Sequence, residues 1–325
     1  MASLKDVARE AGLTVTTVSR VLNNRGYISD DARRRVADAI EKLNYRPNEV
    51  ARALQNKKSN TIGVIVPHIR HPYFAEMISN LENAAYKKGY KILLCNSQST
   101  KEKAKEYIDI CTSNRVAGII LCSQKISVKT FEGLDIPVIT IERAMETATA
   151  SVECDNKNGG KLAAEKLIEA GCNNLLFIKS EDAPATPANQ RFVGFMDACE
   201  KAGVSVKVAQ PNEIDYNSLS YVEWLESILK ENPTADGIFA GSDVIAAQTL
   251  QVCRRLSIQV PEDLKIVGFD DVNIASLTTP QLTTIHQPIK EMANVAMDLL
   301  NDAADGKVVP KKTILPIKLV ERETV

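Results

Sequence analysis

The chain has 325 residues, 44% of them hydrophobic, with 40 Lys and Arg against 41 Asp and Glu. No apolar run reaches the length of a membrane span and no export signal precedes the first predicted helix, so we expect a cytoplasmic protein that is neither exported nor inserted into a membrane. The seven cysteines are odd in number and lack C-x-x-C spacing, which predicts packed thiols and not disulfides or zinc ligands.

Charge is distributed unevenly along the chain. Residues 1–60 carry 12 Lys and Arg against 7 Asp and Glu, whereas the rest of the chain carries 28 against 34. A basic segment joined to an acidic body is typical of a phosphate-binding module attached to a part that does not touch nucleic acid. The N-terminal segment is therefore the candidate nucleic-acid-binding region.

Residues 1–46 predict a helix-turn-helix domain. Ser3 and Asp6 have the spacing of a capping box, and the helix that they start ends at Gly12. Thr14 can cap a second helix over residues 15–22, and Ser29 can cap a third. Two short helices joined by a tight turn, with a third closing the core, match a helix-turn-helix unit, although an ordinary three-helix bundle has the same topology.

The apolar positions of these helices predict which faces are buried. In the second helix Val18, Val21 and Leu22 form an inner face, and Thr16, Thr17 and Arg20 can point outward. In the third helix the predicted inner face consists of Ala32, Val36, Ile40 and Leu43.

From residue 61 onward, strands and helices alternate. Strands are predicted at 61–66, 91–95, 116–122, 138–141, 175–178, 237–240 and 264–268, and the clearest helices at 74–85, 159–170, 191–202 and 243–256. This alternation predicts an α/β fold with doubly wound parallel sheets. Because about 265 residues are more than a single hydrophobic core usually holds, we expect two lobes of similar plan.

The loops that follow these strands are the candidate ligand site, because ligands of open parallel sheets bind beyond the carboxyl ends of the strands. The loops hold carboxylates, an arginine pair and aromatic residues, which suit a polyhydroxylated ligand. The stretches selected in this way are 68–74, Ser123-Gln124, Glu142-Arg143, 183–191, Ser242-Asp243 and Asp270-Asp271. For Asp243, which starts a helix, a capping role fits the position equally well.

Several short sequence motifs of the N-terminal segment resemble those of the LacI/GalR family of bacterial transcription regulators. They are Asp6-Val7-Ala8, the run 17–23 (Thr-Val-Ser-Arg-Val-Leu-Asn), the run 44–48 (Asn-Tyr-Arg-Pro-Asn) and the run 50–54 (Val-Ala-Arg-Ala-Leu). Within the family, the runs 96–98, 283–290 and 314–316 are similar to repressors of ribose and sucrose operons. The resemblance extends through essentially the whole chain.

The resemblance implies a homodimer whose second helices enter successive major grooves of a palindromic double-stranded operator. By position, Val15, Thr16 and Arg20 would read base edges, and Ser19, Asn23 and Asn48 would contact phosphates. Residues 47–59 would form a hinge that folds on DNA, where paired hinge helices push Leu54 into a central base step of the minor groove. The residues expected to contact DNA are Ser3, Thr14, Val15, Thr16, Thr17, Ser19, Arg20, Asn23, Asn48, Ala51 and Leu54.

For residues 60–325 the resemblance implies the fold of periplasmic sugar-binding proteins. The first lobe would comprise about 60–160 plus 289–325, and the second about 161–288, with the chain crossing back near 284–287. A sugar between the lobes would control operator binding. The expected effector-binding residues are Tyr73, Phe74, Glu142, Arg143, Arg191, Ser242, Asp243, Asp270 and Gln287. Ser242 and Glu142 depart from the Asn and Asp that are common in the family, so the identity of the effector does not carry over.

Three other functions fit parts of the pattern. A purine corepressor is compatible with Tyr73-Phe74 and with the run 283–288, and would reverse the sign of the response. A glycosidase would also place carboxylates in a cleft, but no nucleophile motif is present. A transport-type sugar-binding protein would need an export signal. We expect no enzymatic activity, no cofactor and no metal site, since His68 and His71 have no further ligand candidates nearby.

Overall fold

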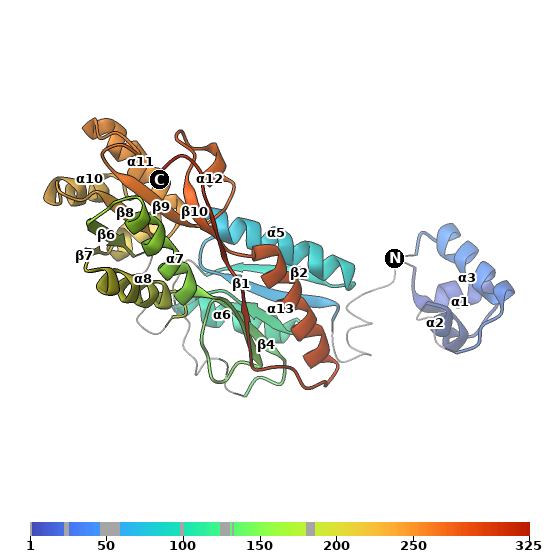
Figure 1. Ribbon diagram of the computed structural model, residues 1–325. Coiled ribbons are helices and arrows are strands. Elements are labelled where there is room, and N and C mark those ends of the chain that lie inside the picture. The colour runs from blue at the N-terminus through green and yellow to red at the C-terminus, as the bar shows by residue number, and fades with distance from the viewer. Residues whose placement is uncertain are drawn as a thin grey trace. The chain divides into compact units, whose positions relative to one another are not determined.

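The computed structural model describes residues 2–22, 26–45, 59–97, 101–123, 131, 133–179 and 186–325. The chain divides into two compact units, Met1–Ser59 and Asn60–Val325, which are described separately below (Figure 1). Most of the predicted hinge lies outside the described residues, and so do Asn23, Asn48, Ala51, Leu54, Gln124 and residues 183–185. Within the described ranges, no helix has both the length and the apolar character needed to cross a membrane.

The N-terminal unit contains the three predicted helices, α1 (Leu4–Ala11), α2 (Val15–Leu22) and α3 (Asp30–Lys42). Their caps are the predicted ones. Ser3 and Asp6 form a reciprocal capping box, and the Thr14 and Ser29 hydroxyls accept hydrogen bonds from the amides of Thr17 (3.1 Å) and Ala32 (3.3 Å). The small core between the helices consists of Val7, Ala8, Ala11, Val18, Val36 and Ala39.

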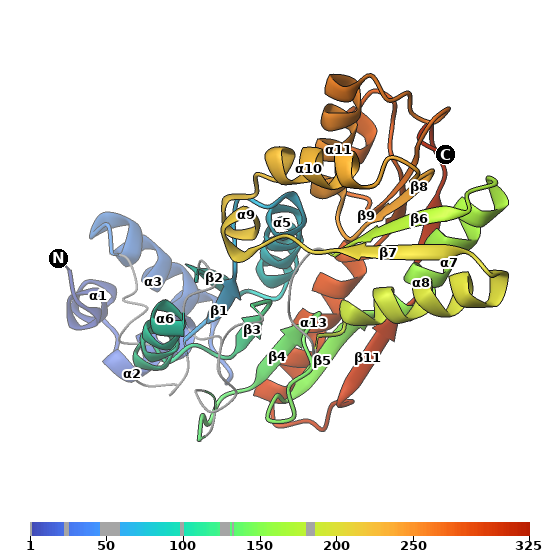
Figure 2. The same ribbon diagram turned by 90° about the vertical axis from the view of Figure 1, so that its left-hand side faces the viewer.

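The core unit consists of two six-stranded sheets with helices on both faces (Figure 2). Its first half comprises β1 (Thr61–Val66), α5 (Pro72–Lys87), β2 (Lys91–Asn96), α6 (Lys101–Ser113), β3 (Ile119–Leu121), β4 (Val138–Ile141) and β5 (Ala150–Cys154). The second half comprises α7 (Asn156–Glu169), β6 (Asn174–Ile178), α8 (Asn189–Ala202), β7 (Ser205–Ala209), α9 (Glu213–Ser218), α10 (Val222–Glu231), β8 (Gly237–Ala240), α11 (Asp243–Leu256), β9 (Lys265–Asp270), α12 (Ile274–Leu277) and β10 (Thr283–His286). The chain ends with α13 (Ile289–Ala304), β11 (Lys312–Leu315) and β12 (Lys318–Val320).

The strand order explains why the predicted strands read as unbroken apolar runs. The first sheet has the order β11-β5-β4-β3-β1-β2 and the second β12-β10-β9-β8-β6-β7, and every pairing is parallel except that of β12 with β10. In the first lobe α5 and α13 pack on one face and α6 on the other. In the second lobe α7 and α8 pack on one face, and α10 and α11 on the other. Each central strand is therefore buried on both sides.

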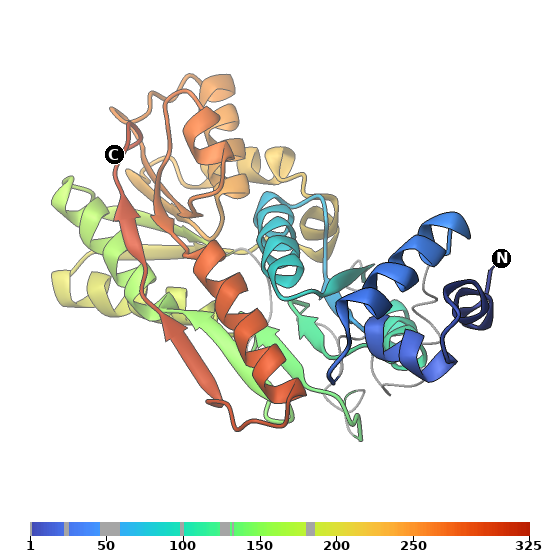
Figure 3. The ribbon, with the colours of Figure 1, turned by 90° about the vertical axis from the view of Figure 1, so that its right-hand side faces the viewer.

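The chain crosses between the lobes three times. It passes from β5 to α7, returns from β10 to α13, and crosses again from β11 to β12 (Figure 3). The third crossing was not predicted, because residues 289–325 were all expected in the first lobe. Pro316 follows β11, and residues 318–320 then pair antiparallel with β10, where Thr284 lies opposite Val320. The buried Thr324 hydroxyl donates to the Ile266 carbonyl (2.6 Å), which secures this end in the second lobe.

Two glycines allow α7 and α8 to touch along their backbones. A Cβ atom on Gly160 would lie 1.8 Å from the carbonyl oxygen of Arg191, and one on Gly194 would lie 1.8 Å from that of Lys157. Neither neighbouring atom can move aside, since both belong to helical backbone. The contact brings the first turn of α7 against the first turn of α8, which becomes important for the site described below.

We therefore expect Gly194→Ala to lower the free energy of unfolding. Added volume in a tight contact typically costs about 1–3 kcal/mol, and backbone contacts leave less room for relaxation than side chains do. Urea unfolding followed by circular dichroism measures the change. Glu200→Ala, at an exposed position of the same helix, is the matched control and should stay within about 0.5 kcal/mol of the parent. Equal stability of the parent protein and the Gly194 variant would contradict this account of the helix pair.

Candidate functional site

A cavity of about 90 Å³ lies at the carboxyl ends of the strands of the core unit. It is lined from both lobes, as the rule for parallel sheets predicts. The first lobe contributes Pro67, His71, Tyr73, Phe74, Cys122 and Glu142, and the second contributes Ala188, Arg191, Tyr216, Tyr221, Gly241, Ser242 and Asp270, with Gln287 at the second crossing. Seven of the nine predicted effector-binding residues are among them.

Arg191 is the cationic centre of the cavity. It lies in the first turn of α8 and is buried, with its guanidinium 3.5 Å from the centroid of the Phe269 ring. Its Nε donates to Asn156 Oδ1 (2.7 Å) and its Nη1 to the Gly241 carbonyl (2.9 Å). The Nη2 atom lies 3.8 Å from Glu142 Oε2. These partners fix the plane of the guanidinium before any ligand enters.

Glu142 follows β4 and faces Arg191 from the first lobe. Its Oε1 accepts from the Cys154 amide (2.6 Å), and its Oε2 accepts from Asn156 Nδ2 (2.8 Å). Burial raises the pKa of the Glu142 carboxyl, although Arg191 and these two donors oppose the rise. The residue has a positive φ of 53°, a left-handed conformation that is uncommon for a residue other than glycine.

Asp270 ends β9 and lines the same cavity as Arg191. Its Oδ1 accepts from Gln287 Nε2 (2.6 Å). Burial raises the pKa of Asp270 to about 7, with Arg191 and Gln287 acting against the rise. The Gln287 side chain is held by this bond, and its Oε1 atom is buried and finds no hydrogen-bond partner among the described residues. That oxygen is therefore an acceptor open to a ligand.

Aromatic rings close the cavity. Tyr73 and Phe74 lie in the first turn of α5, with their rings packed edge to face at 5.1 Å. The Tyr73 hydroxyl is buried and has no partner within the described part of the chain. His71 caps α5 through Nδ1, which accepts from the Tyr73 amide (3.2 Å), and burial lowers the pKa of His71 to about 4. The imidazole is therefore neutral near pH 7.

Two predicted residues, Arg143 and Asp243, do not line the cavity. The buried Arg143 side chain points to the first lobe, where Nη1 donates to the Ser123 carbonyl. Asp243 accepts from the Val272 amide (2.9 Å) and the Thr284 hydroxyl (2.5 Å), so it joins the loop after β9 to strand β10. The helix cap that was an alternative for Asp243 is made by Ser242, whose hydroxyl accepts from the Ile245 amide (3.4 Å).

Among the residues of the site that were not predicted from the sequence are two tyrosines and an asparagine. Tyr216 and Tyr221 line the cavity from the segment that follows β7, and Asn156 joins Glu142 to Arg191. The two tyrosines obey the same rule as the other residues, since they follow the carboxyl end of a strand. The sequence predicts no strand at 205–209, so it predicts no site loop after these residues either. Asn156 had no comparable signal.

The N-terminal unit presents the predicted reading surface on α2. Val15, Thr16 and Arg20 are exposed there, and Thr17 shares a hydrogen bond with the Thr14 cap (2.9 Å). Tyr27, in the turn after α2, is also exposed and was not predicted. Ser3 and Thr14 act as helix caps, and any contact that they make with DNA stays a prediction. Elsewhere in the described part of the chain, no group of His, Cys, Asp and Glu is arranged to hold a metal ion.

Comparisons with known proteins decide the family. A model described as "Bacterial regulatory proteins, lacI family" matches residues 3–48, and one described as "Periplasmic binding protein-like domain" matches residues 164–325. The ribose operon repressor of Halalkalibacterium halodurans is 36% identical over 325 residues, covering 100% of this chain and 97% of that protein. The chain belongs to the lacI family.

Two further relatives of this lacI-family chain agree with the assignment. The sucrose operon repressor of Streptococcus mutans is 35% identical over 325 residues and is covered completely, as is this chain. A solved structure, the periplasmic binding protein/LacI transcriptional regulator of Alkaliphilus metalliredigens in complex with D-xylulofuranose, is 33% identical with a TM-score of 0.74. The alignment covers 82% of this chain and 99% of that one.

Family membership confirms the predicted fold, a two-lobed α/β core with an N-terminal helix-turn-helix head. It also confirms the predicted class, a DNA-binding transcriptional regulator and not an enzyme. The glycosidase and the sugar-binding protein without a DNA role, which were alternatives at the level of the sequence, do not fit this family.

Proposed function

We propose that this lacI-family protein represses a carbohydrate operon as a homodimer. An unphosphorylated sugar of about the size of a pentose binds in the cavity and controls the affinity of the protein for the operator. The observation that carries the proposal is the set of hydrogen-bonding groups left for a ligand. Gln287 Oε1 is an acceptor and the Tyr73 hydroxyl can donate or accept, and both are buried beside Asp270. A sugar hydroxyl both donates and accepts, so a polyol can satisfy all three groups.

The charges of the cavity favour an uncharged sugar over a sugar phosphate. Glu142 and Asp270 bring two carboxylates, and Arg191 is the single cationic side chain in the described lining. Two of the Arg191 nitrogens already donate within the protein, to Asn156 and Gly241. A phosphate would meet carboxylates in a site of low dielectric with few free donors, which is unfavourable.

The size of the cavity favours a monosaccharide. The cavity measures about 90 Å³. This suits a five-carbon sugar better than a disaccharide or a purine nucleoside. The relatives named for ribose and the structure holding D-xylulofuranose make D-ribose and D-xylulose the first ligands to test.

The homodimer is proposed because helix-turn-helix regulators bind the two half-sites of an operator with two copies of the reading head. Two reading heads on a two-fold dimer suit a palindromic operator. Sedimentation at micromolar concentration should give the mass of a dimer.

Control of the operator by the sugar is a coupling between two sites. A ligand that contacts both lobes favours one lobe orientation, and the dimer then holds its hinge segments and heads differently. Couplings of this kind are typically about 1–3 kcal/mol, and they are reciprocal: the sugar changes operator affinity by the factor by which the operator changes sugar affinity. An operator titration with and without D-ribose or D-xylulose, at fixed salt, tests the proposal. Operator affinity that ignores every sugar tested would contradict it.

Arg20→Ala is expected to weaken binding to the cognate operator and to relax its sequence preference. An Arg that forks onto a guanine contributes about 1–3 kcal/mol of discrimination, so the loss should be roughly 5- to 150-fold. Fluorescence anisotropy with operator and with scrambled DNA measures both effects. Arg34→Ala removes the same charge from exposed α3 and should leave sequence preference intact. If both variants lose the two kinds of binding equally, Arg20 does not read bases. Sugar binding should be unchanged in both.

A further inference from the structure

Asn156 occupies an unusual place between the two lobes. It is the first residue of α7, immediately after the first crossing, and it is 3% exposed. Its Nδ2 donates to Glu142 Oε2 (2.8 Å) and to the Cys154 carbonyl (3.2 Å), and its Oδ1 accepts from Arg191 Nε (2.7 Å). One amide therefore connects an acid of the first lobe to the arginine of the second.

The chemistry of the partners leaves the amide a single orientation. Arginine can only donate, and an ionised carboxylate can only accept. The amide oxygen must therefore face Arg191 and the nitrogen must face Glu142. Leu or an ionised Asp of similar size would each lose at least one of the bonds at these two positions.

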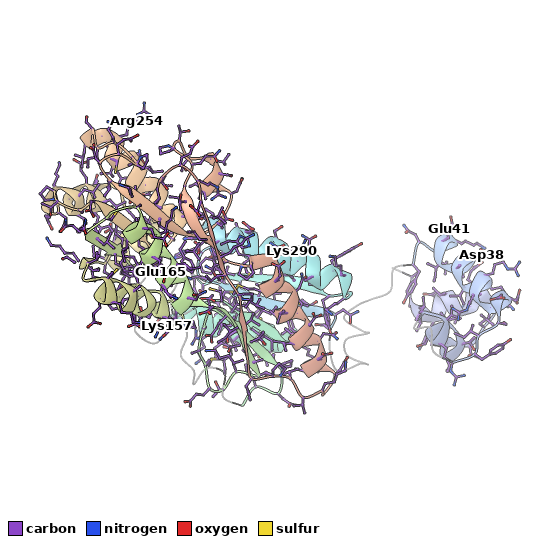
Figure 4. The ribbon with its side chains drawn as sticks, viewed as in Figure 1. Asp38, Glu41, Lys157, Glu165, Arg254 and Lys290 are labelled. Carbon is purple, nitrogen blue, oxygen red and sulfur yellow. The ribbon has the colours of Figure 1, made fainter. Side chains whose placement is uncertain are left out.

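The backbone around Asn156 is held firmly. The Asp155 carboxylate caps α7 by accepting from the Asn158 amide (3.1 Å), and Gly160 lets α7 rest directly on the Arg191 carbonyl. The outer side of α7 has a different environment, in which Lys157 and Glu165 extend toward solvent (Figure 4). Asn156 faces inward, and it is not among the side chains that line the cavity.

We propose that Asn156 is a positioning residue of the effector site, which aligns the Arg191 guanidinium with the Glu142 carboxylate across the first crossing between the lobes. The proposal rests on the proposed function, because it assumes that the cavity binds a sugar. Asn156 acts on that sugar through Arg191 and Glu142 and does not touch it. Its replacement should thus change affinity for the sugar through the state of its two partners.

Asn156→Asp separates this role from simple packing. It keeps the acceptor for Arg191 but puts a second carboxylate against Glu142. With one cation nearby, two facing carboxylates hold a proton between them at neutral pH. When that proton is bound, the acid donates as the amide did. The charged and titratable groups around Glu142 are Arg191 on α8, Asp270 on β9, Tyr73 on α5, Cys122 after β3 and Cys154 at the end of β5.

The experiment measures binding of D-ribose and D-xylulose by calorimetry at pH 5.5 and pH 8, with each variant compared to the parent protein at the same pH. We expect Asn156→Asp to bind at least ten-fold more weakly than the parent at pH 8 and to approach it at pH 5.5. Asn156→Ala should lose affinity by a similar factor at both values. Asn158→Asp is the matched control, since it makes the same change in the same helical turn but lies in a groove beside Lys157 and Lys161. The ratio of its sugar affinity to that of the parent should stay near one at both pH values.

A second measurement needs no sugar. In Asn156→Asp the pair of carboxylates has a raised pKa in the folded state, so stability is present at low pH and is lost as pH rises through that pKa. Its melting temperature should fall further below that of the parent at pH 8 than at pH 5.5. Asn158→Asp should show no such fall, because a carboxylate in the first turn of a helix is stabilising.

The outcomes separate the two proposals. If the parent binds neither sugar nor any other sugar tested, the proposed function fails, whatever the variants do. The effector role of Asn156 then fails with it. The melting data still show whether the link between Asn156 and Glu142 exists. If the parent binds sugar but the affinity ratio of Asn156→Asp is the same at both pH values, the positioning role is wrong and the proposed function stands.

Discussion

Replacing Arg191 with Met is expected to remove the sugar response and leave the operator bound. Met keeps the apolar stem of the side chain but loses the guanidinium, which stacks on Phe269 and donates to Asn156 and Gly241. Removing one partner of a buried charge cluster costs about 3–5 kcal/mol, because the remaining charges stay buried without compensation. If half of that cost falls on the ligand complex, sugar affinity drops by roughly 10- to 70-fold. The operator complex, whose reading surface lies in the other unit, should form as before.

The stability of the Arg191 variant should depend on pH. Burial raises the pKa of Glu142 and Asp270, and Arg191 opposes both shifts. Without it these pKa values rise further, and an acid with a raised folded-state pKa contributes stability at low pH that is lost as pH increases. The deficit in the free energy of unfolding should therefore be larger at pH 8 than at pH 5.5, as measured by urea unfolding at both values.

Arg143→Met is the matched control for this experiment. Arg143 is a buried arginine like Arg191, but it follows β4. Its guanidinium donates to the Ser123 carbonyl and does not line the cavity. The control should lose stability while keeping sugar affinity within a few-fold of the parent. Equal losses of sugar affinity in the two variants would mean that Arg191 acts only through the stability of the core, and would contradict its role as a ligand contact.

Asp270→Asn is expected to stabilise the protein while it weakens sugar binding. Burial raises the pKa of Asp270 to about 7, against an ordinary value of 3.8. Ionising this group in the folded protein is therefore costly. The stability that the protonated carboxyl contributes is complete below about pH 4 and is lost as pH rises toward 7. One pKa unit corresponds to about 1.4 kcal/mol, so removing the charge should raise the free energy of unfolding at pH 8 by a few kcal/mol.

The amide is a conservative replacement in shape. The oxygen of the new side chain would still accept from Gln287 Nε2, and asparagine tolerates the positive φ of this position as well as aspartate does. The stabilisation should disappear below about pH 4, where Asp270 becomes protonated in both states. Asp243 lies in the same acidic cluster, and burial and the charge of Asp270 raise its pKa, so part of the gain comes from relief of Asp243.

Sugar affinity should change in the opposite direction. A carboxylate accepts two hydrogen bonds from neighbouring sugar hydroxyls, whereas an amide turns one acceptor into a donor, and a lost charge-assisted bond is worth about 1.5–3 kcal/mol. Affinity for D-ribose and D-xylulose should therefore fall roughly 10- to 150-fold at pH 8, as measured by calorimetry. A variant that is no more stable than the parent at pH 8 would show that Asp270 is not held in a costly ionised state.

The sequence by itself determined the local parts of this protein. The three helices of the head begin at Ser3, Thr14 and Ser29 because a cap depends on residues within one turn of the chain. Strands such as 61–66 and 237–240 were predictable because burial on both faces demands an unbroken apolar run. The loops after the parallel strands then identified most of the cavity, including Glu142, Arg191 and Asp270, and the family resemblance added Gln287.

Elements whose partners lie far along the chain were decided only by the tertiary structure. β12 has only three residues and shows no alternation of apolar and polar residues. It forms a strand because it pairs with the edge of β10. Tyr216 and Tyr221 line the cavity because β7 pairs with β6, and β7 is an exposed edge strand with a weak apolar signal.

The polar links across the cavity were also decided by tertiary packing. Whether a buried acid or arginine faces the ligand or another loop depends on which carbonyls and amides end up beside it, as with Arg143 and Ser123, or Asp243 and Val272. Asn156 lies between Glu142 and Arg191 only because Gly160 and Gly194 let two helices touch. Hydrogen bonds reach about 3 Å, so their partners are set by packing between distant segments, which no local pattern in the chain encodes.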